Sequence, residues 1–220
     1  MMAARKGFLV VWLCSIVYAA STMTVTAQQS GAVSTGAVFS WETIAVEYKQ
    51  QILDDAEFAQ AVDRMYANGM TKYKDVTLFR GEEPVTRQQA AKFFSQFSKE
   101  VIFSTMDVSK YCRFSDLDQA DPSLKNYVLE ACLFSLFQGS SGKFFPDAVL
   151  TKDQAIAVLM RAINNGFMDE ETDPRWRLYY EKAFDFGITK ETSLENFSNP
   201  LSRYELALLL RRAWVLIQAQ

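Results

Sequence analysis

The sequence predicts an all-α protein: three tandem helix-loop-helix repeats close into a pseudo-three-fold helical bundle, and an N-terminal helix precedes them. Three observations predict this fold. The same helix start is written three times, the apolar positions after each start coincide, and a similar first helix stands before each start. A unit of two helices is too small to bury its apolar face alone, so we expect the three units to pack into one domain.

Residues 1–27 are predicted to be a secretory signal peptide. Arg5 and Lys6 precede an apolar run from Gly7 to Ala20, and Val25-Thr26-Ala27 supplies the small residues of a cleavage site before Gln28. The run is short for a membrane span, so we expect cleavage rather than an uncleaved anchor, and no embedded membrane segment afterwards. Residues 28–40 carry no charge and are rich in small side chains, which predicts a flexible lead-in.

Composition limits the classes of function. With 49% apolar and 22% charged residues, a packed core is expected. Loss of residues 1–27 lowers the basic count from 23 to 21 and leaves all 26 acids, so the formal net charge becomes −5, which argues against a nucleic-acid partner. The chain has no histidine, no Gly-x-Ser-x-Gly elbow and no phosphate-binding loop. We therefore expect a non-catalytic protein without a cofactor or a metal.

Two cysteines remain after Cys14 is removed with the signal peptide. Cys112 and Cys132 can form a disulfide in an exported chain. Cys132 also falls on the apolar face of a predicted helix, where a buried free thiol is the alternative. The sequence leaves both interpretations open.

The predicted helices and repeats follow in order. Residues 41–56 have apolar side chains three or four apart and predict the N-terminal helix, whose apolar stripe should cover one end of the domain. Repeat 1 is 57–113, repeat 2 is 114–166 and repeat 3 is 167–217. Asn68-Gly69 should end the first helix of repeat 1 through a left-handed residue. The first helices share a register, with equivalent residues Phe58, Leu124 and Trp176, then Val62, Val128 and Tyr180, then Met65, Ala131 and Ala183, then Met70, Leu136 and Ile188.

Each second helix should begin with a capping box, in which a hydroxyl side chain and the residue three positions later satisfy each other's backbone N–H groups. Such a cap stabilises a helix start by about 1 kcal/mol. The predicted pairs are Thr86 with Gln89, Thr151 with Gln154, and Ser202 with Glu205.

A basic residue follows each cap directly, as Arg87, Lys152 and Arg203. A cation at this end of a helix is disfavoured by a few tenths of a kcal/mol or more, because the backbone dipole is already positive there. Helix stability therefore does not explain these residues. Beside free helix N–H groups, however, a cation would form a good site for a carboxylate.

The repeats resemble S-layer homology repeats over Trp41 to about Ile217. The motifs that carry the resemblance are an F-x-D opening, an aromatic residue starting a helix, a Gly-Ile at its end, an F-x-P loop and a T-R-A-E-like helix start. The resemblance implies grooves between repeats that bind secondary cell-wall polysaccharide, often pyruvylated and attached to peptidoglycan. It also implies that the basic residue of the helix start, here Arg87, Lys152 or Arg203, contacts the ligand.

Three departures from the family pattern weaken parts of this expectation. Lys152 stands where arginine is usual and lacks its planar pair of donors. Repeat 3 has Phe197-Ser198-Asn199-Pro200 in place of F-x-P, and repeat 1 opens with Ile52-Leu53-Asp54 instead of a phenylalanine motif. We expect the sites at Arg87 and Arg203 to be more dependable than the site at Lys152.

Several residues have a second interpretation. The three cations can instead pair with acids near the repeat openings, where a surface ion pair contributes about 0 to 1 kcal/mol. Trp176 and Tyr180 are candidates for a sugar-stacking platform, but their helical spacing fits a core position or a groove wall equally well. Asp116-x-Asp118-x-x-Asp121 hints at calcium but lacks the glycine and glutamate of a calcium loop, so we expect a solvated acidic turn.

The sequence thus predicts a non-catalytic cell-envelope protein that binds an acidic wall polysaccharide through Arg87, Lys152, Arg203 and Trp176. The alternative is a surface assembly or adaptor protein in which the same fold binds a protein partner. A wall hydrolase would need paired carboxylates across a cleft, and the sequence places no such pair.

Overall fold

The computed structural model of the chain describes residues 41–164, 177–191 and 194–219, with side chains for 54–164, 177–191 and 195–219. The predicted signal peptide at 1–27, the predicted lead-in at 28–40 and the candidate ligand residue Trp176 lie outside the described residues. The described part of the chain is helical and contains no strand beyond isolated bridges, so the prediction of an all-α protein is confirmed.

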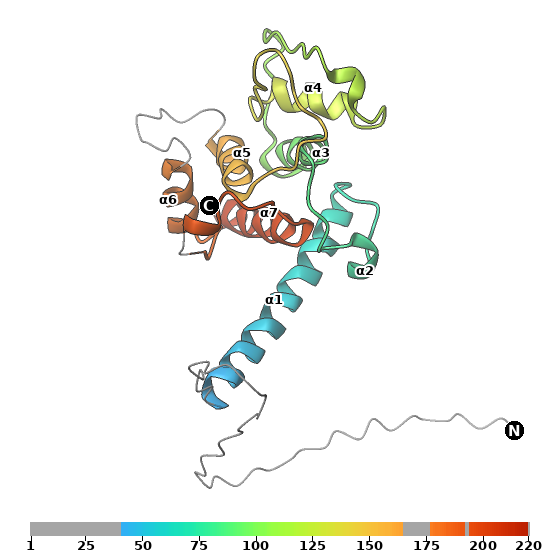
Figure 1. The fold of residues 1–220 in the computed structure, drawn as a ribbon. Helices are drawn as coiled ribbons and strands as arrows, with labels where there is room; N and C mark the ends of the chain where they lie inside the picture. Colours follow the sequence, from blue (N-terminus) through green and yellow to red (C-terminus); the bar gives the residue numbers. More distant parts are fainter. Residues whose placement is uncertain (1–40, 165–176, 192–193, 220) are drawn as a thin grey trace, which may run out of the picture. The chain divides into compact units, whose positions relative to one another are not determined.

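The helices follow the predicted order (Figure 1). They are α1 (Trp41–Ala67), α2 (Val76–Phe79), α3 (Arg87–Phe97), α4 (Lys125–Leu133), α5 (Lys152–Asn164), α6 (Arg177–Asp185) and α7 (Arg203–Gln218). A π-helical turn at Ser98–Ile102 and 3-10 turns at Leu117–Gln119 and Leu194–Asn196 lie between them. Repeat 1 therefore pairs α1 with α3, repeat 2 pairs α4 with α5, and repeat 3 pairs α6 with α7.

Residues 41–56 are helical as predicted, but the predicted end of this helix at residue 56 is wrong, because α1 runs without interruption from Trp41 to Ala67. No glycine or proline lies in this range, so nothing in the backbone ends a helix near residue 56. The predicted end is confirmed: Gly69 has φ +66°, and the Met70 N–H donates to the Met65 carbonyl at 2.9 Å. The side chains of 41–53 are not described, so the expected role of their apolar stripe stays a prediction.

The second helix of each repeat packs against the first helix of the next repeat. α3 packs on α4, α5 packs on α6, and α7 returns to pack on α1 (Figure 1). This order of contacts is cyclic, so each repeat buries its apolar face only with help from its neighbours. The arrangement explains why a single pair of helices would not suffice.

Three equivalent residues close the centre of the bundle. Val85, Leu150 and Leu201 each stand one position before a helix cap, and each is at most 1% exposed. The Val85 N–H donates to Leu201 at 3.0 Å, the Leu201 N–H to Leu150 at 2.8 Å, and the Leu150 N–H to Val85 at 2.8 Å. This closed cycle of backbone hydrogen bonds satisfies buried polar groups and agrees with the predicted three-fold closure.

A disulfide joins Cys112 to Cys132, with 5.9 Å between their Cα atoms. Of the two interpretations that the sequence left open, the structure therefore selects the bonded pair. The bond ties the segment after the π-helical turn to the end of α4.

In the part of the chain that the structure describes, no helix has the length and apolar character needed to cross a bilayer.

Candidate functional site

The N-terminal amides of the second helices are occupied by the neighbouring repeat. The Arg87 N–H donates to the Ala148 carbonyl at 2.9 Å, and the Gln88 N–H donates to the Pro146 carbonyl at 3.0 Å. The same bonds join Lys152 to Asn199 and Asp153 to Phe197, and join Arg203 to Glu83 and Tyr204 to Gly81. The expectation of free helix N–H groups beside the three cations is therefore wrong.

These carbonyls explain why a cation is tolerated at each helix start. Each loop brings two negative carbonyl ends onto a helix end whose dipole is positive, so the unfavourable field at the basic side chain is reduced. The acceptors stand five and three residues before the following cap in all three repeats. Because the bonds use backbone carbonyls, Phe197 accepts in repeat 3 where Pro146 accepts in repeat 2. The missing F-x-P motif therefore leaves this contact intact.

Arg87 is held by neutral groups of repeat 2. Its Nε–H donates to the Phe144 carbonyl at 2.9 Å, and its Cζ lies 5.1 Å from the Phe144 ring centroid and 5.2 Å from that of Phe137. Among the described residues no carboxylate pairs with it. Burial lowers the pKa of the guanidinium, which the charge of Asp116 opposes. Arg87 is thus a fixed, partly desolvated cation that no carboxylate of the described ranges contacts.

A pocket of about 280 Å³ opens beside Arg87 between repeats 1 and 2. We call it the Arg87 pocket. No acidic side chain of the described ranges lines it, so its walls combine one cation with neutral polar and apolar groups. The residues that line it are Arg87, Gly139, Ser140, Phe145, Ala148, Val149 and Gln154.

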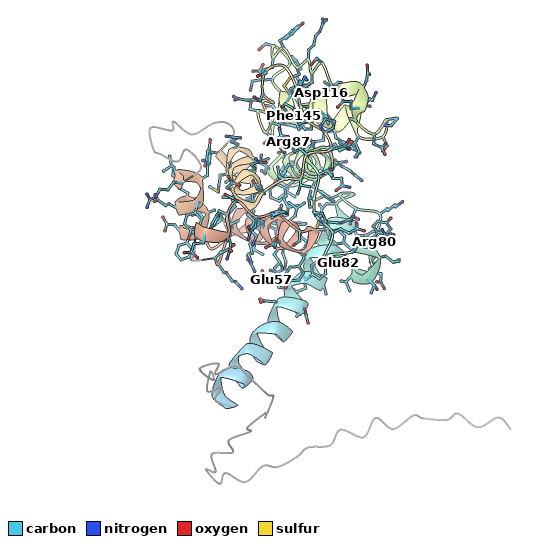
Figure 2. The ribbon with its side chains drawn as sticks, viewed as in Figure 1. Glu57, Arg80, Glu82, Arg87, Asp116 and Phe145 are labelled. Atoms are coloured by element: carbon cyan, nitrogen blue, oxygen red, sulfur yellow. A yellow bond between two sulfur atoms is a disulfide. The ribbon has the colours of Figure 1, made fainter. Side chains whose placement is uncertain are left out.

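Asp116 organises the loop that forms this pocket (Figure 2). The residue is 5% exposed, and its carboxylate accepts from the Phe144 N–H and the Phe145 N–H, both at 2.8 Å. Burial acts to raise the pKa of Asp116, but the backbone hydrogen bonds from Phe144, Phe145 and Asp116 itself, together with the charge of Lys143, outweigh it and leave the pKa below its ordinary value. The prediction of a solvated acidic turn is therefore wrong for Asp116, which is a buried acceptor.

The other two acids of that motif have separate local partners. Asp118 pairs with Lys125 at 3.3 Å, and Asp121 accepts from the Ser123 N–H at 2.8 Å. No group of three or more potential metal ligands gathers anywhere in the described ranges.

Lys152 is neutralised by acids of repeat 3. Its Nζ lies 2.6 Å from Glu205 Oε1 and 3.6 Å from Glu191 Oε2. Burial acts to lower the pKa of Lys152, and the bonds and charges of the two glutamates raise it by more. The pocket that Lys152 lines measures about 120 Å³ and contains both glutamates. This geometry matches the alternative interpretation, in which the cation pairs with acids of the protein itself.

Arg203 has an intermediate environment. Its Nη1 lies 3.6 Å from Glu83 Oε2, and its Cζ lies 4.6 Å from the centroid of the Phe79 ring. Its Nε is buried and has no hydrogen-bond partner among the described residues. Burial lowers the pKa of Arg203 and the charge of Glu83 opposes the change. The adjacent pocket of about 670 Å³ is lined by Asp55 and Glu82 but not by Arg203 itself.

Two equivalent positions account for the difference between the three cations. At the position three residues before its own cap, the neighbouring repeat has Ala148 next to Arg87 but Glu83 next to Arg203. Three residues after the cap, it presents Gln154 to the Arg87 pocket but Glu205 to Lys152. Within the described part of the chain, only the pocket between repeats 1 and 2 is neutral at both positions.

The predicted capping boxes are confirmed at two of the three helix starts. Thr86 pairs reciprocally with Gln89, and Ser202 pairs reciprocally with Glu205. The Thr151 hydroxyl donates to the carboxylate of Asp153, and its reciprocal bond with Gln154 stays a prediction.

The structure also places residues that the sequence did not single out as site residues. Phe145, Ala148 and Asp116 shape the Arg87 pocket, although they lie in repeat 2 and Arg87 lies in repeat 1. The alignment of Phe145 and Ala148, six and three residues before the cap, was visible in the sequence. The sequence does not show, however, that each loop packs on the start of the second helix of the preceding repeat. Tyr180 is 9% exposed and packs on Phe197, which favours its core interpretation.

No family model matches the chain. A cell surface protein of Thermoanaerobacter kivui is 33% identical to it over 164 residues, which cover 74% of this chain and 20% of that protein. The chain therefore spans about a fifth of the length of this curated relative.

Proposed function

We propose that this chain is a non-catalytic protein of the cell envelope, built from three S-layer homology repeats, and that its Arg87 pocket binds an acidic cell-wall polysaccharide. The similarity to a cell surface protein supports the location. The observation that carries the binding site is the Arg87 guanidinium, which no described carboxylate pairs with, beside a pocket without acids. Lys152 has no ligand contact in this proposal, because Glu205 and Glu191 already neutralise it.

The geometry favours a carboxylate ligand. Arg87 uses its Nε–H on the Phe144 carbonyl, so the two terminal nitrogens can donate side by side to a carboxylate in the pocket. The rings of Phe137 and Phe144 hold the guanidinium and exclude water, so little conformational freedom is lost on binding and the charge is less screened. A single contact of this kind is weak, and repeated acidic sugars along a polymer would supply retention.

The test is co-sedimentation of the protein with purified sacculi that retain their polysaccharide. Arg87→Met should weaken binding about tenfold or more, since a charge-assisted bond contributes about 1.5 to 3 kcal/mol. Arg87→Lys should have an intermediate effect, because the charge remains while the two-pronged donor is lost. Lys152→Met should bind like the wild type.

Arg177→Met is the matched control, because this exposed arginine pairs only with Glu181 at 3.2 Å on α6 among the contacts described. Thermal unfolding of every variant separates loss of binding from loss of fold. Unchanged binding by folded Arg87→Met, or no binding by the wild type, would contradict the proposal.

The second candidate function is a surface adaptor that binds a protein partner, and one observation favours it. Residues 103–111 expose Phe103, Val108 and Tyr111 at 79%, 85% and 78%. The Asp107 N–H anchors this segment to the Leu133 carbonyl at 3.0 Å, and the disulfide holds its end. Fixed, exposed apolar side chains are typical of interaction surfaces. Light scattering of the wild type and of the double variant Phe103→Ser with Val108→Ser tests this function. A wild-type oligomer that the double variant does not form would support it, and a monomeric wild type would count against it.

A further inference from the structure

We propose that Phe145 is the residue against which the sugar ring of the ligand packs, opposite Arg87, so that the pocket selects a cyclic sugar acid rather than a small carboxylate. This inference rests on the proposed function of the Arg87 pocket. It assigns the aromatic contact to Phe145, which stands six positions before the Thr151 cap.

The exposure of Phe145 is the first observation. Its side chain is 44% exposed on the wall of the Arg87 pocket, whereas the neighbouring Phe144 is completely buried. Phe145 therefore contributes little to the core while it presents a large apolar face to the pocket. Val149, 43% exposed, extends this face. Sugar rings have an apolar face of C–H groups, and an aromatic ring is the flat, rigid surface that fits it.

The backbone of Phe145 is the second observation. Its φ is +60°, a left-handed conformation that costs free energy for a residue other than glycine or asparagine. Asp116 enforces it by accepting the N–H groups of Phe144 and Phe145 at once. The chain thus keeps an aromatic side chain where glycine would relieve strain. The strained backbone thereby fixes where the Phe145 side chain stands on the wall of the pocket.

The equivalent loop of repeat 1 provides an internal comparison (Figure 2). Arg80 stands at the same distance from its cap and is also left-handed, with φ +54°. Its side chain is exposed and donates to Glu83 at 3.0 Å. The left-handed conformation therefore belongs to the loop, while the aromatic side chain is particular to the Arg87 pocket.

The arrangement determines how a sugar acid would lie. The carboxylate would accept from the terminal nitrogens of Arg87, and the ring face would cover Phe145. Ser140 and Gln154, which also line the pocket, can hydrogen-bond the ring hydroxyls. A small acid such as acetate would make only the first of these contacts.

The experiment is isothermal titration of the protein with polysaccharide released from purified sacculi, followed by competition with glucuronate and with acetate. Phe145→Gly should bind the polysaccharide about tenfold more weakly. Its melting temperature should not fall, because glycine adopts φ +60° without strain. Phe145→Asn should lose the same affinity, since asparagine tolerates this conformation while keeping a restrained loop. Phe145→Tyr should stay within about twofold of the wild type, because the ring is kept.

Arg80→Gly is the matched control, because it removes the equivalent left-handed side chain outside the pocket and should leave affinity unchanged. Glucuronate should compete more strongly than acetate with the wild type, and this difference should become smaller in Phe145→Gly, which keeps only the contacts of Ser140 and Gln154 with the ring hydroxyls. Full affinity in Phe145→Gly or in Phe145→Asn would overturn the inference. If Arg87→Met loses binding while the Phe145 variants keep it, only this inference fails. If Arg87→Met also binds normally, the proposed function fails with it.

Discussion

Gln154→Glu should weaken ligand binding in the Arg87 pocket without unfolding the protein. Gln154 lines this pocket and is the predicted partner of Thr151 in a capping box. The equivalent residue of repeat 3, Glu205, caps its helix and also lies 2.6 Å from Lys152. The substitution keeps the shape of the side chain and adds a negative charge. It therefore gives Arg87 a nearby carboxylate, as Glu205 does for Lys152.

The expected magnitude follows from the charge that is added. At about 6 Å, and with an effective dielectric constant of about 20, two unit charges interact with about 3 kcal/mol before screening. Screening by solvent leaves about 1 to 2 kcal/mol of repulsion between the introduced carboxylate and a ligand carboxylate, which corresponds to about 5- to 30-fold weaker binding. A carboxylate in the first helical turn also stabilises the helix by about 0.3 to 1 kcal/mol, so stability should not fall.

Titration calorimetry with released polysaccharide and thermal unfolding measure the two effects separately. Gln89→Glu is the matched control, because Gln89 forms the equivalent capping box of repeat 1 and lies outside the lining of the Arg87 pocket. It should gain similar stability and bind normally. Wild-type affinity in Gln154→Glu, or an equal loss in Gln89→Glu, would refute the reasoning.

Three further predictions concern stability. Glu57 bonds Arg212 twice at 2.8 Å, and mainly that hydrogen bond lowers its pKa from 4.5. The stability that ionised Glu57 contributes is therefore present above pH 4.5 and lost as the pH falls through the folded pKa. Glu57→Gln should lower the free energy of unfolding in urea by about 2 kcal/mol at about pH 7, and by progressively less in acid. Leu150→Ala should cost about 3 kcal/mol, lowering the melting temperature by about 6 to 12 °C, and a loss below about 1 kcal/mol would show that the central cycle is not tightly packed. Cys112→Ser with Cys132→Ser should cost about 3 kcal/mol in urea unfolding, and adding reductant to the wild type should match it; equal stability of reduced and oxidised protein would contradict this.

The sequence predicted the helix starts well because a capping box is local. Thr86 and Ser202 bond residues three positions away, so their roles are legible without knowledge of the fold. The cyclic closure was predictable too, since three units with coincident apolar positions have few other ways to bury them. The end of α1 at Ala67, followed by the left-handed Gly69, was likewise encoded locally.

The environment of each cation was not predictable, because it is set by another repeat. Arg87 keeps no carboxylate partner among the described residues since Ala148 and Gln154 approach it, whereas Lys152 meets Glu205. These contacts join residues that belong to different repeats and lie far apart in the sequence. Helix periodicity gives the face of each helix but not which loop packs on its end. The occupied N-terminal amides were missed for the same reason.

The break predicted after residue 56 failed for a different physical reason. The repeats predicted where a unit begins, but a unit boundary needs no break in a helix. The segment around Asp54 and Asp55 contains only residues that continue a helix, so α1 passes through it.

The central claim is that Arg87 binds a carboxylate of the wall polysaccharide, and one measurement tests it most directly. Released polysaccharide is divided, and the carboxyl groups of one half are reduced to alcohols; both halves are then titrated into the wild type and into Arg87→Met. The wild type should bind the native polymer about tenfold or more tightly than the reduced polymer, while Arg87→Met should bind both equally and weakly. Equal binding of the two polymers by the wild type would contradict the claim.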